Sequence, residues 1–460
     1  MDNRGKFTSN FGFIMAAVGS AVGLGNLWAF PYKLGANGGF AFLLIYIIMI
    51  FLVGFILIIA ELAIGRKTKL NPVGAFRALN KKFAFAGWFG IVAAFLILSF
   101  YSVLGGWSIK YFFTYIMDIF GKGFGDLSGE AFFNNFISDP VQPLIFTAMF
   151  IGIIFFISIA GVEKGIEKSA KIMMPMLFFI LVIVIIRSVT LPNAMEGIKF
   201  IFKPDFSFLS NGKFGEVIAA ALSQMFFSLS LGMGAMITYG SYLKKDANIE
   251  KNAILIPLFD TLIAVMAAIA IMPAVFSFNL DPAAGPGLLF VVLREVFASI
   301  PFGDIFGAAF FLLVIFAAVT SGVSLLEVVS SYFIDEKKFS RKKSASIVCS
   351  TCFALGIPVS LGFGLLKDVK LPQLNGVFVN ILDFYDYVGE YVLMTLGAFI
   401  LCIVVAYVIK PKTIVMEVEA NGNVFKSKKY WCFMMKFITP LLVLLTFLTA
   451  TGILNFQLIL

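Results

Sequence analysis

The chain has 460 residues, of which 60% are hydrophobic and 13% charged, with a formal net charge of +9 and a mean hydropathy of +0.99. Soluble globular proteins contain about 45–50% apolar and about 25% charged residues, so this composition excludes a water-soluble fold and indicates a membrane protein. Histidine is absent, which excludes Ser-His-Asp and Cys-His catalysis and histidine-ligated metals. The basic residues are dispersed over many loops, which argues against nucleic-acid binding.

Eleven stretches are long and apolar enough to cross about 30 Å of hydrocarbon as helices. None shows the period-2 alternation of a membrane β-barrel. We therefore expect a helical bundle with spans at about residues 11–34, 39–65, 84–120, 142–161, 170–192, 215–243, 252–278, 304–334, 344–366, 380–409 and 430–459.

The distribution of lysine and arginine predicts how the bundle is oriented. Most of the 35 basic residues lie before the first span or in the loops after spans two, four, six, eight and ten. Cytoplasmic loops carry such an excess. We expect a multi-pass protein of the cell membrane with a cytoplasmic N-terminus and, after an odd number of spans, an extracellular C-terminus.

Spans one and six differ from the others because glycines interrupt them. The first contains Gly19, Gly23 and Gly25, and the sixth contains Gly232 and Gly234. Glycine costs about 1 kcal/mol relative to alanine inside a helix, so the clusters favour unwinding. Close packing through small residues is the alternative, but it does not explain the polar residues beside both clusters. Unwound backbone at membrane depth is tolerated only where it is buried in protein or lines a cavity.

Interruptions at matching positions of two five-span halves are typical of transporters built from inverted repeats, with the binding site near the midplane. Asp260 in span seven is a candidate functional residue because a carboxylate at mid-span is costly; placement beside a water-filled vestibule is the alternative. Glu61 and Glu327 are further intramembrane acids, which we expect to brace the unwound segments.

The assembled pattern resembles the neurotransmitter:sodium symporter family, especially its bacterial amino-acid transporters with the LeuT-type fold. The resemblance covers nearly the whole chain. It rests on the motifs Gly19-Ser-Ala-Val-Gly-Leu-Gly-Asn-Leu-Trp28 with Phe30-Pro31, Glu61-Leu-Ala-Ile-Gly-Arg66, Gln224-Met-Phe-Phe-Ser-Leu-Ser-Leu-Gly-Met-Gly234, Tyr239-Gly-Ser-Tyr242 and Thr320-Ser321.

This resemblance implies one all-α transmembrane domain over residues 1–460. Its core would be a 5+5 inverted repeat with helices 1 and 6 unwound at mid-membrane. The first repeat would cover about residues 11–192, the second about 215–409, and an additional helix about 430–459.

The resemblance also implies two sodium sites and one substrate site. The first sodium site would be formed by Ala21, Asn26, Ser228 and Asp260, and the second by Gly19, Val22, Ala317, Thr320 and Ser321. The substrate site would be formed by Ser20, Ala21, Leu24, Gly25, Ile97, Tyr101, Phe227, Ser228, Ser230, Met233, Ser321 and Leu325.

The implied function is sodium-coupled import of an amino acid by alternating access, without enzymatic activity. Asp260 stands where the family usually has a neutral ligand, and its charge would replace chloride, so we expect chloride independence. Met233 stands where leucine-type members have phenylalanine; methionine is slimmer and more adaptable, so we expect a bulky hydrophobic or aromatic L-amino acid. The sequence does not indicate an oligomeric state.

The resemblance assigns gating residues at both ends. On the cytoplasmic side these are Arg4, which would pair with Asp335, the surrounding Phe7, Tyr239 and Tyr242, and the Gly165-x9-Pro175 motif that would let the fifth helix unwind. On the outside Asp386 matches the family's acidic gate residue. Ala29, however, stands where most members carry a cation, so the usual outer ion pair cannot form; Tyr101 and Phe227, or another cation, would close this side.

Two other classes of function fit a membrane protein with broken helices. An ion channel can build its filter from broken helices, but channels usually repeat the filter around an oligomeric axis. An intramembrane enzyme without histidine would need an aspartyl pair or a Ser-Lys dyad. Asp383 and Asp386 are such a pair, but they lie at the outer end of a span.

Overall fold

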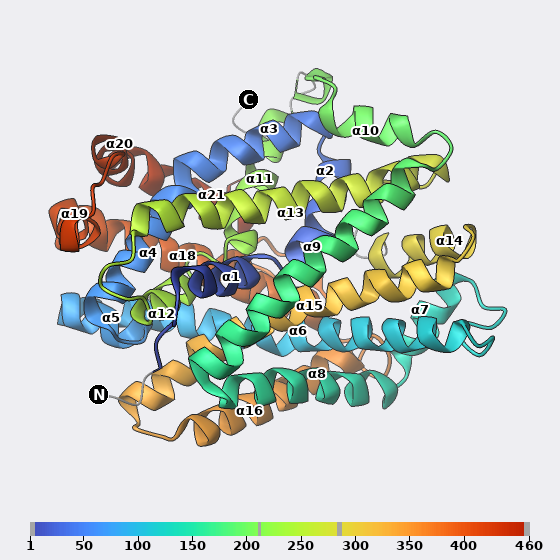
Figure 1. Ribbon diagram of the computed structural model, residues 1–460, viewed down its shortest axis with the longest axis horizontal. Helices are drawn as coiled ribbons and strands as arrows, with labels where there is room; N and C mark the ends of the chain where they lie inside the picture. The colour runs from blue at the N-terminus through green and yellow to red at the C-terminus, as the bar shows by residue number, and fades with distance from the viewer. Residues whose placement is uncertain (1–4, 210–212, 283–287, 455–460) are drawn as a thin grey trace.

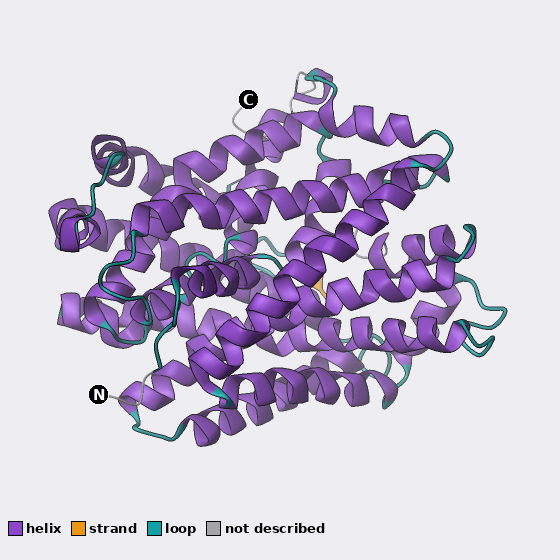
Figure 2. Cartoon of the chain, in the orientation of Figure 1, coloured by secondary structure: helices purple, strands orange, loops and turns teal. Residues whose placement is uncertain are grey.

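Helices make up most of the structure, a computed structural model that describes residues 5–209, 213–282 and 288–454 (Figure 2). Within these residues the strands are Leu371–Pro372 (β1) and Phe378–Val379 (β2). They pair antiparallel, with Leu371 opposite Val379. The protein is thus an all-helical bundle with one small hairpin.

Nine helices of the described residues are long and apolar enough to cross a membrane. Several contain a π-helical turn or combine two shorter helices. They are Phe40–Thr68 (α3, Phe40–Met49, and α4, Phe55–Thr68), Lys81–Asp118 (α6 from Ala84), Gln142–Ile159 (α8), Val162–Val189 (α9 from Lys168), Ile249–Ser277 (α13), Gly303–Glu336 (α15), Arg341–Leu361 (α16), Ile381–Val408 (α17, Ile381–Asp386, and α18, Thr395–Ile403) and Lys428–Ala450 (α20, Lys428–Phe433, and α21, Thr439–Ala450).

Two further apolar segments are interrupted. Helix α1 (Asn10–Ala21) is followed by a second helical piece, Gly25–Ala36, which ends in α2 (Phe30–Ala36) and is bent by 53° relative to α1. Helix α11 (Phe214–Ser228) is separated from α12 (Ala235–Ser241) by turns. These interruptions lie at the glycine clusters of the two segments that we expected to be broken.

The remaining helices are short and connect the long ones near the ends of the bundle. Two begin at a capping side chain: Asn71 accepts a hydrogen bond from the Gly74 N–H at the start of α5, and Ser128 accepts one from the Ala131 N–H at the start of α7. These helices are α5 (Pro72–Leu79), α7 (Gly129–Ser138), α10 (Ala194–Phe202), α14 (Leu293–Ala298) and α19 (Pro411–Val418), with 3₁₀ turns at Lys81–Phe83 and Ala420–Gly422.

The long helices differ in how deeply they are buried. In the most apolar window of α15, 83% of the residues are buried within the protein, against 28% for the segment Val162–Val189. Helix α15 packs along α6, and α1 packs against α9, α13 and α15 in the middle of the bundle (Figure 1). The centre of the protein is therefore built around the interrupted helix α1 and the long helix α15.

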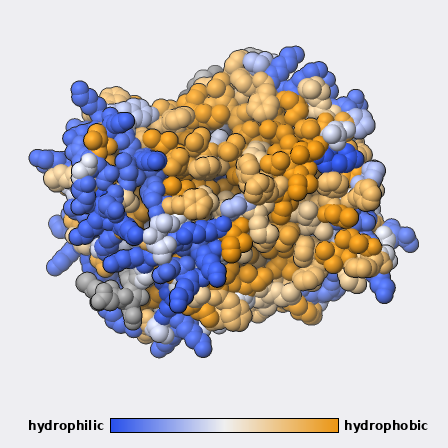
Figure 3. Space-filling model, viewed as in Figure 1, coloured by the Kyte–Doolittle hydropathy of each residue, from blue (hydrophilic) through white to orange (hydrophobic). Residues whose placement is uncertain are grey.

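The outer surface has the character of a membrane protein. Hydrophobic side chains cover the middle of the visible face, and hydrophilic ones gather at the end that holds α5 and α19 (Figure 3). Large hydrophobic side chains such as Phe51, Phe156 and Phe179 are exposed on the long helices. A protein in water would bury them, so the chain is a multi-pass membrane protein.

The helix boundaries agree with the expected spans to within several residues at most positions. The expected fifth span, 170–192, begins earlier, because a π-helical turn over Val162–Glu167 precedes α9. The expected last span, 430–459, begins at Lys428 and its helix ends at Ala450. Residues 455–459 of that expected span lie outside the described residues.

Candidate functional site

The interruptions of the two broken segments lie against each other in the interior. The Ser230 hydroxyl donates a hydrogen bond of 3.0 Å to the carbonyl of Ser20 at the end of α1. The Gln224 side-chain amide donates one of 2.9 Å to the carbonyl of Gly25, where the second piece of that segment begins. Ser230 thus satisfies a carbonyl at the end of α1, and Gln224 adds a second bond to the Gly25 carbonyl, which also accepts from the Phe30 N–H.

Asp260 of α13 lies beside both interruptions and is fully buried. Its carboxylate accepts hydrogen bonds from the Asn26 amide at 2.7 Å and from the Ser228 hydroxyl at 2.8 Å. A third donor, the Tyr46 hydroxyl, lies 3.3 Å away. Three of the residues expected at the first sodium site therefore meet, and their neutral donors stabilise a buried negative charge.

The fourth oxygen ligand expected at the first sodium site is the carbonyl of Ala21, the last residue of α1. Ala21 and Ser228 both line a small central cavity, which is described below. The Asn26 side chain also closes the turn between the two helical pieces, because its oxygen accepts a hydrogen bond of 3.0 Å from the Gly23 N–H.

A second cluster of oxygen atoms surrounds the hydroxyl of Ser321 on α15. This hydroxyl lies 3.2 Å from the carbonyl oxygens of Gly19 and Ser20 and 3.1 Å from that of Val22. A hydroxyl has one proton to donate, so most of the lone pairs in this cluster remain without a proton. Sodium is a hard cation, and such cations prefer oxygen ligands.

Thr320 and Ala317, the other residues expected at the second sodium site, lie next to this cluster. The Thr320 hydroxyl bonds to the carbonyls of Phe316 at 3.0 Å and Ala317 at 3.1 Å on its own helix. The Thr320 side chain is also close to Gly19, since a Cβ atom there would lie 3.1 Å from the Thr320 Cβ.

A small cavity of about 20 Å³ lies between these two clusters. All residues expected at the substrate site line it except Leu24, and Gly23 lines it in addition. The Tyr101 hydroxyl accepts a hydrogen bond of 3.2 Å from the Leu24 N–H, so Leu24 also reaches the site through its backbone. A cavity of this size holds about one water molecule, so an amino acid can enter only after the surrounding side chains move.

The ring of Phe227 covers one wall of the small cavity. A Cβ atom at Gly25 would lie 2.7 Å from this ring, so the ring packs directly on the backbone of the first interruption. On the other side of Phe227 and Tyr101 is a second cavity of about 270 Å³. The two aromatic side chains separate a small inner cavity from a large outer one.

Aromatic side chains also close the opposite end of the site. Phe7 is 2% exposed and makes edge contacts with Phe13, Tyr239 and Tyr242, with ring centroids 5.4, 5.8 and 6.3 Å away. The residue next to it, Thr8, donates its backbone N–H to Glu167 at 2.7 Å. The segment before α1 is therefore tied to the bundle.

The expected ion pair between Arg4 and Asp335 falls partly outside the described residues, because Arg4 is not among them. Asp335 accepts hydrogen bonds from the Asn71 backbone at 2.8 Å and from its side chain at 3.1 Å. A buried ion pair that we did not expect lies nearby in sequence: Arg341 binds both oxygens of Glu327 at 2.6 and 2.9 Å. Arginine favours this two-point geometry.

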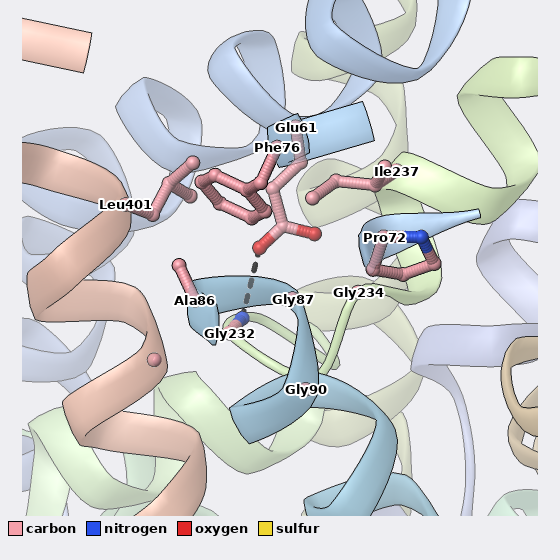
Figure 4. Close-up of a pocket in the computed structure, with 11 residues that line it drawn as sticks. Glu61, Pro72, Phe76, Ala86, Gly87, Gly90, Gly232, Gly234, Ile237 and Leu401 are labelled. Atoms are coloured by element: carbon pink, nitrogen blue, oxygen red, sulfur yellow. Dashed lines mark hydrogen bonds between the residues drawn. The ribbon is translucent and has the colours of Figure 1, made fainter. Parts of the chain in front are cut away.

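The intramembrane acids Glu61 and Glu327 have different roles in the structure. Glu61 points at the second interruption, and its carboxylate accepts a hydrogen bond of 2.8 Å from the Gly232 N–H across a cavity of about 10 Å³ (Figure 4). Glu327 is bonded to Arg341 and to the Tyr242 hydroxyl. Through Tyr242 it contacts the end of α12, the second piece of the sixth segment, and its expected role as a brace stays a prediction.

The Gly165-x9-Pro175 segment is helical in this structure. Gly165 lies within the π-helical turn Val162–Glu167, and Pro175 lies inside α9. Proline removes one backbone hydrogen bond from a helix and a π-helical turn weakens others. The segment therefore carries two local weaknesses about three turns apart, although it is wound here.

The sequence reasoning missed Tyr46, Lys33 and Glu390. Tyr46 touches Asp260, and the other two line the outer cavity together with Asp386. Tyrosine in a membrane helix is usually a packing residue, so Tyr46 carried no signal of its own. Lys33 lies near the end of its span, where charge is ordinary, and Glu390 lies inside its span but was not singled out; the folded structure places both around one cavity.

The chain matches the family described as "Sodium:neurotransmitter symporter family" over residues 4–120 and 135–458. The uncharacterized sodium-dependent transporter YhdH of Bacillus subtilis is 39% identical over 462 residues, covering 98% of each chain. An uncharacterized sodium-dependent transporter of Haemophilus influenzae is 34% identical, covering 97% of this chain and 98% of its own. The crystal structure of MhsT in complex with L-phenylalanine matches with a TM-score of 0.88 and 43% identity, over 97% of this chain and 100% of that chain.

Proposed function

Because this chain belongs to the sodium:neurotransmitter symporter family and is a sodium-dependent transporter rather than an enzyme, we propose that it imports a hydrophobic or aromatic amino acid together with sodium. The observation that carries the proposal is the meeting of Asp260, Asn26 and Ser228 at the two interruptions. A buried carboxylate held only by neutral donors attracts a cation, and it lies beside the cavity expected for the substrate.

The proposed architecture has eleven spans, of which the first and sixth are unwound at mid-membrane. Residues 11–192 and 215–409 form two inverted repeats, and the last helix is additional to them. The N-terminus lies in the cytoplasm and the C-terminus outside. The bend of 53° between α1 and Gly25–Ala36 supports this proposal, as does the separation of α11 from α12.

The two proposed sodium sites have different chemical character. The first uses the Asp260 carboxylate, the side chains of Asn26 and Ser228, and the carbonyl of Ala21. The second uses the neutral oxygens around Ser321, which lie within 3.2 Å of its hydroxyl. The carbonyl oxygens around Ser321 have more lone pairs than there are protons to bind them, and this surplus supports the second site.

The substrate is proposed to lie between the two sodium sites, with its carboxylate at the Leu24 and Gly25 N–H groups and the Tyr101 hydroxyl. Its amine would face the carbonyls of Ala21 and Phe227. Ile97, Phe227, Met233 and Leu325 would surround its side chain; all four line the inner cavity and none carries a charge. The similarity to MhsT, whose structure contains L-phenylalanine, supports an apolar or aromatic substrate.

Coupling follows from the shared position of these ligands. A substrate carboxylate at the end of the first interruption completes the shell of the first sodium ion, so each ligand increases the affinity for the other. Each sodium ion that enters down the membrane potential supplies about 2.3 kcal/mol per 100 mV. Because Asp260 supplies a fixed negative charge, the cycle is proposed to run without chloride, and Asp260 is also the proposed proton carrier if the empty carrier returns protonated.

Uptake into proteoliposomes tests the proposed function. With sodium outside and a negative interior, we expect concentrative uptake of L-phenylalanine that disappears when the sodium gradient is collapsed and persists when chloride is replaced by gluconate. In competition, tryptophan, tyrosine, phenylalanine and leucine should inhibit more strongly than glycine. A sodium current that is independent of substrate would support a channel instead, and stronger inhibition by glycine would contradict the proposed pocket.

A further inference from the structure

The outer cavity contains a lysine that the proposed transport cycle has not used. Lys33 lies in the last turn of α2, is 9% exposed, and lines the cavity of about 270 Å³. Among the described residues, no carboxylate oxygen lies within 4 Å of its ammonium group and no hydrogen bond reaches it. A buried charge without a partner is costly, so pairing the Lys33 ammonium group with a carboxylate would lower the free energy of the protein.

Three acids line the same cavity: Asp383, Asp386 and Glu390. Asp383 is already bonded to Asn380 at the start of α17, whose side-chain amide donates to its carboxylate at 2.8 Å, so Asp386 and Glu390 are the two considered as partners of Lys33. Asp386 ends α17, and Glu390 lies four residues later in the helical segment Tyr387–Met394. This spacing puts both carboxylates on one helix face. Glu390 is 5% exposed; the Ser223 hydroxyl lies 3.5 Å from its carboxyl group, and the carboxyl groups of Glu390 and Asp386 share a hydrogen bond.

Lys33, Asp386 and Glu390 line the same cavity as two aromatic side chains. The cavity floor includes Tyr101 and Phe227, which separate it from the inner cavity. Ala29, one helical turn before Lys33, lines the cavity without a charge. A lysine side chain is long and flexible and offers three donors, so from the next turn it can span part of the cavity toward both acids.

Resting on the proposed transport function, we infer that Lys33 is the cation of the outer gate. When the cavity closes, its ammonium group binds between Asp386 and Glu390 and draws α2 toward α17 above Tyr101 and Phe227. Pairing then compensates charges that closure removes from water. In this structure the gate is unpaired, since no ion pair among the described residues joins Lys33 to Asp386 or Glu390.

Three variants test this role. Lys33→Gln removes the charge, Lys33→Arg retains it, and Asp386→Asn with Glu390→Gln removes both acids. The matched control is Lys199→Gln, since Lys199 on α10 is an exposed lysine paired with exposed Glu196. Gate closure is measured as protection of Leu104→Cys, a cavity-lining position, from a membrane-impermeant maleimide in a Cys432→Ser background.

In the wild-type background, sodium with L-phenylalanine should slow modification of the cysteine by about fivefold or more. In Lys33→Gln, and in the variant that lacks both acids, this protection should fall below about twofold, and uptake should fall about tenfold. Equilibrium binding of L-phenylalanine should change less than about threefold, because Lys33 does not line the inner cavity. Lys33→Arg and Lys199→Gln should behave like the wild type.

The inference also predicts that removing the cation has no further effect once the acids are gone, since the charges act as one unit. Full protection of the cysteine in Lys33→Gln, or in the variant lacking both acids, would overturn the inference while leaving the proposed function intact. If the wild type itself accumulates no amino acid, the proposed function fails instead. If Lys33→Gln does not fold, protection of the cysteine in the variant Asp386→Asn with Glu390→Gln tests the inference.

Discussion

Asp260 is held in the interior by Asn26, Ser228 and Tyr46, all of them neutral donors. Neutral donors lower the cost of a buried carboxylate but leave its charge uncompensated. A sodium ion at this point would supply the missing positive charge. At the scale of single residues, Asp260 is therefore the group whose chemistry sets the ion dependence of the protein.

Replacing Asp260 with asparagine tests this assignment. Asparagine has nearly the same shape but no charge, and its amide cannot accept hydrogen bonds from all three donors. We expect the sodium concentration required for half-maximal substrate binding to rise about tenfold or more in chloride-free buffer, equivalent to about 1.4 kcal/mol. Binding of radiolabelled L-phenylalanine at increasing sodium concentrations measures the change.

The matched control for this variant is Asp126→Asn, because Asp126 is exposed in a loop. It should bind sodium and substrate as the wild type does. Chloride should restore part of the affinity of Asp260→Asn, since an added anion replaces the missing charge. Unchanged sodium dependence of Asp260→Asn without chloride would disprove the charge-balance argument.

At the scale of elements, the interruption between α11 and α12 depends on backbone shapes that few residues adopt. Gly232 has φ of 80° and Gly234 has φ of 77°. A Cβ atom at Gly232 would overlap the Met394 carbonyl oxygen. The interruption is thus packed directly against the helical segment Tyr387–Met394, and Glu61 holds the Gly232 N–H from the other side.

Gly232→Ala should disrupt this packing. The variant combines a left-handed backbone, which costs alanine about 1–2 kcal/mol, with a steric overlap against the neighbouring backbone. We expect a lower melting temperature in detergent and at least about tenfold slower uptake. Thermal unfolding and proteoliposome uptake measure the two effects.

Gly376→Ala provides the matched control for the backbone effect. Gly376 also has φ of 80°, in the hairpin between β1 and β2, but a Cβ atom there would meet nothing within 4 Å. This variant should lose stability modestly and transport normally. Equal losses of transport in the two alanine variants would show that the close approach to Met394 is unimportant.

At the scale of the whole molecule, charge and hydropathy divide the surface into zones. The end of the bundle that holds α5 and α19 is hydrophilic, and apolar side chains cover the middle (Figure 3). The loop between α5 and α6 carries Lys81 and Lys82 at this end, whereas the loop after α6 emerges at the opposite end, near α7 (Figure 1). The excess of basic residues therefore predicts which end faces the cytoplasm.

Cysteine labelling tests this orientation. Lys82 and Lys122 are both exposed and lie in the loops at opposite ends of α6. In a Cys432→Ser background, Lys122→Cys should react with a membrane-impermeant maleimide in intact cells. Lys82→Cys should react only after the membrane is permeabilised. The reverse pattern would contradict the proposed orientation.

Much of the fold could be predicted from sequence, because long apolar runs and glycine clusters act locally. The interruption after Ala21 lies where Gly23 and Gly25 indicated it. Single polar residues were harder to place. The pairing of Glu327 with Arg341 was not expected. Tyr46 was not considered, because its partner Asp260 is 214 residues away in the chain and leaves no trace in the sequence around Tyr46.

The sequence by itself determined that the chain crosses a membrane as helices, since only helices satisfy the backbone of such long apolar runs in lipid. It also determined where two of these helices are interrupted. The resemblance already grouped Asn26 with Asp260 and Ser321 with Gly19. Only the tertiary structure decided which further polar groups meet: the Tyr46 hydroxyl with Asp260, and the Ser230 hydroxyl with the carbonyl of Ser20. These groups are more than 200 residues apart in the chain, and the packing of whole helices, which no local pattern specifies, sets the distances between them.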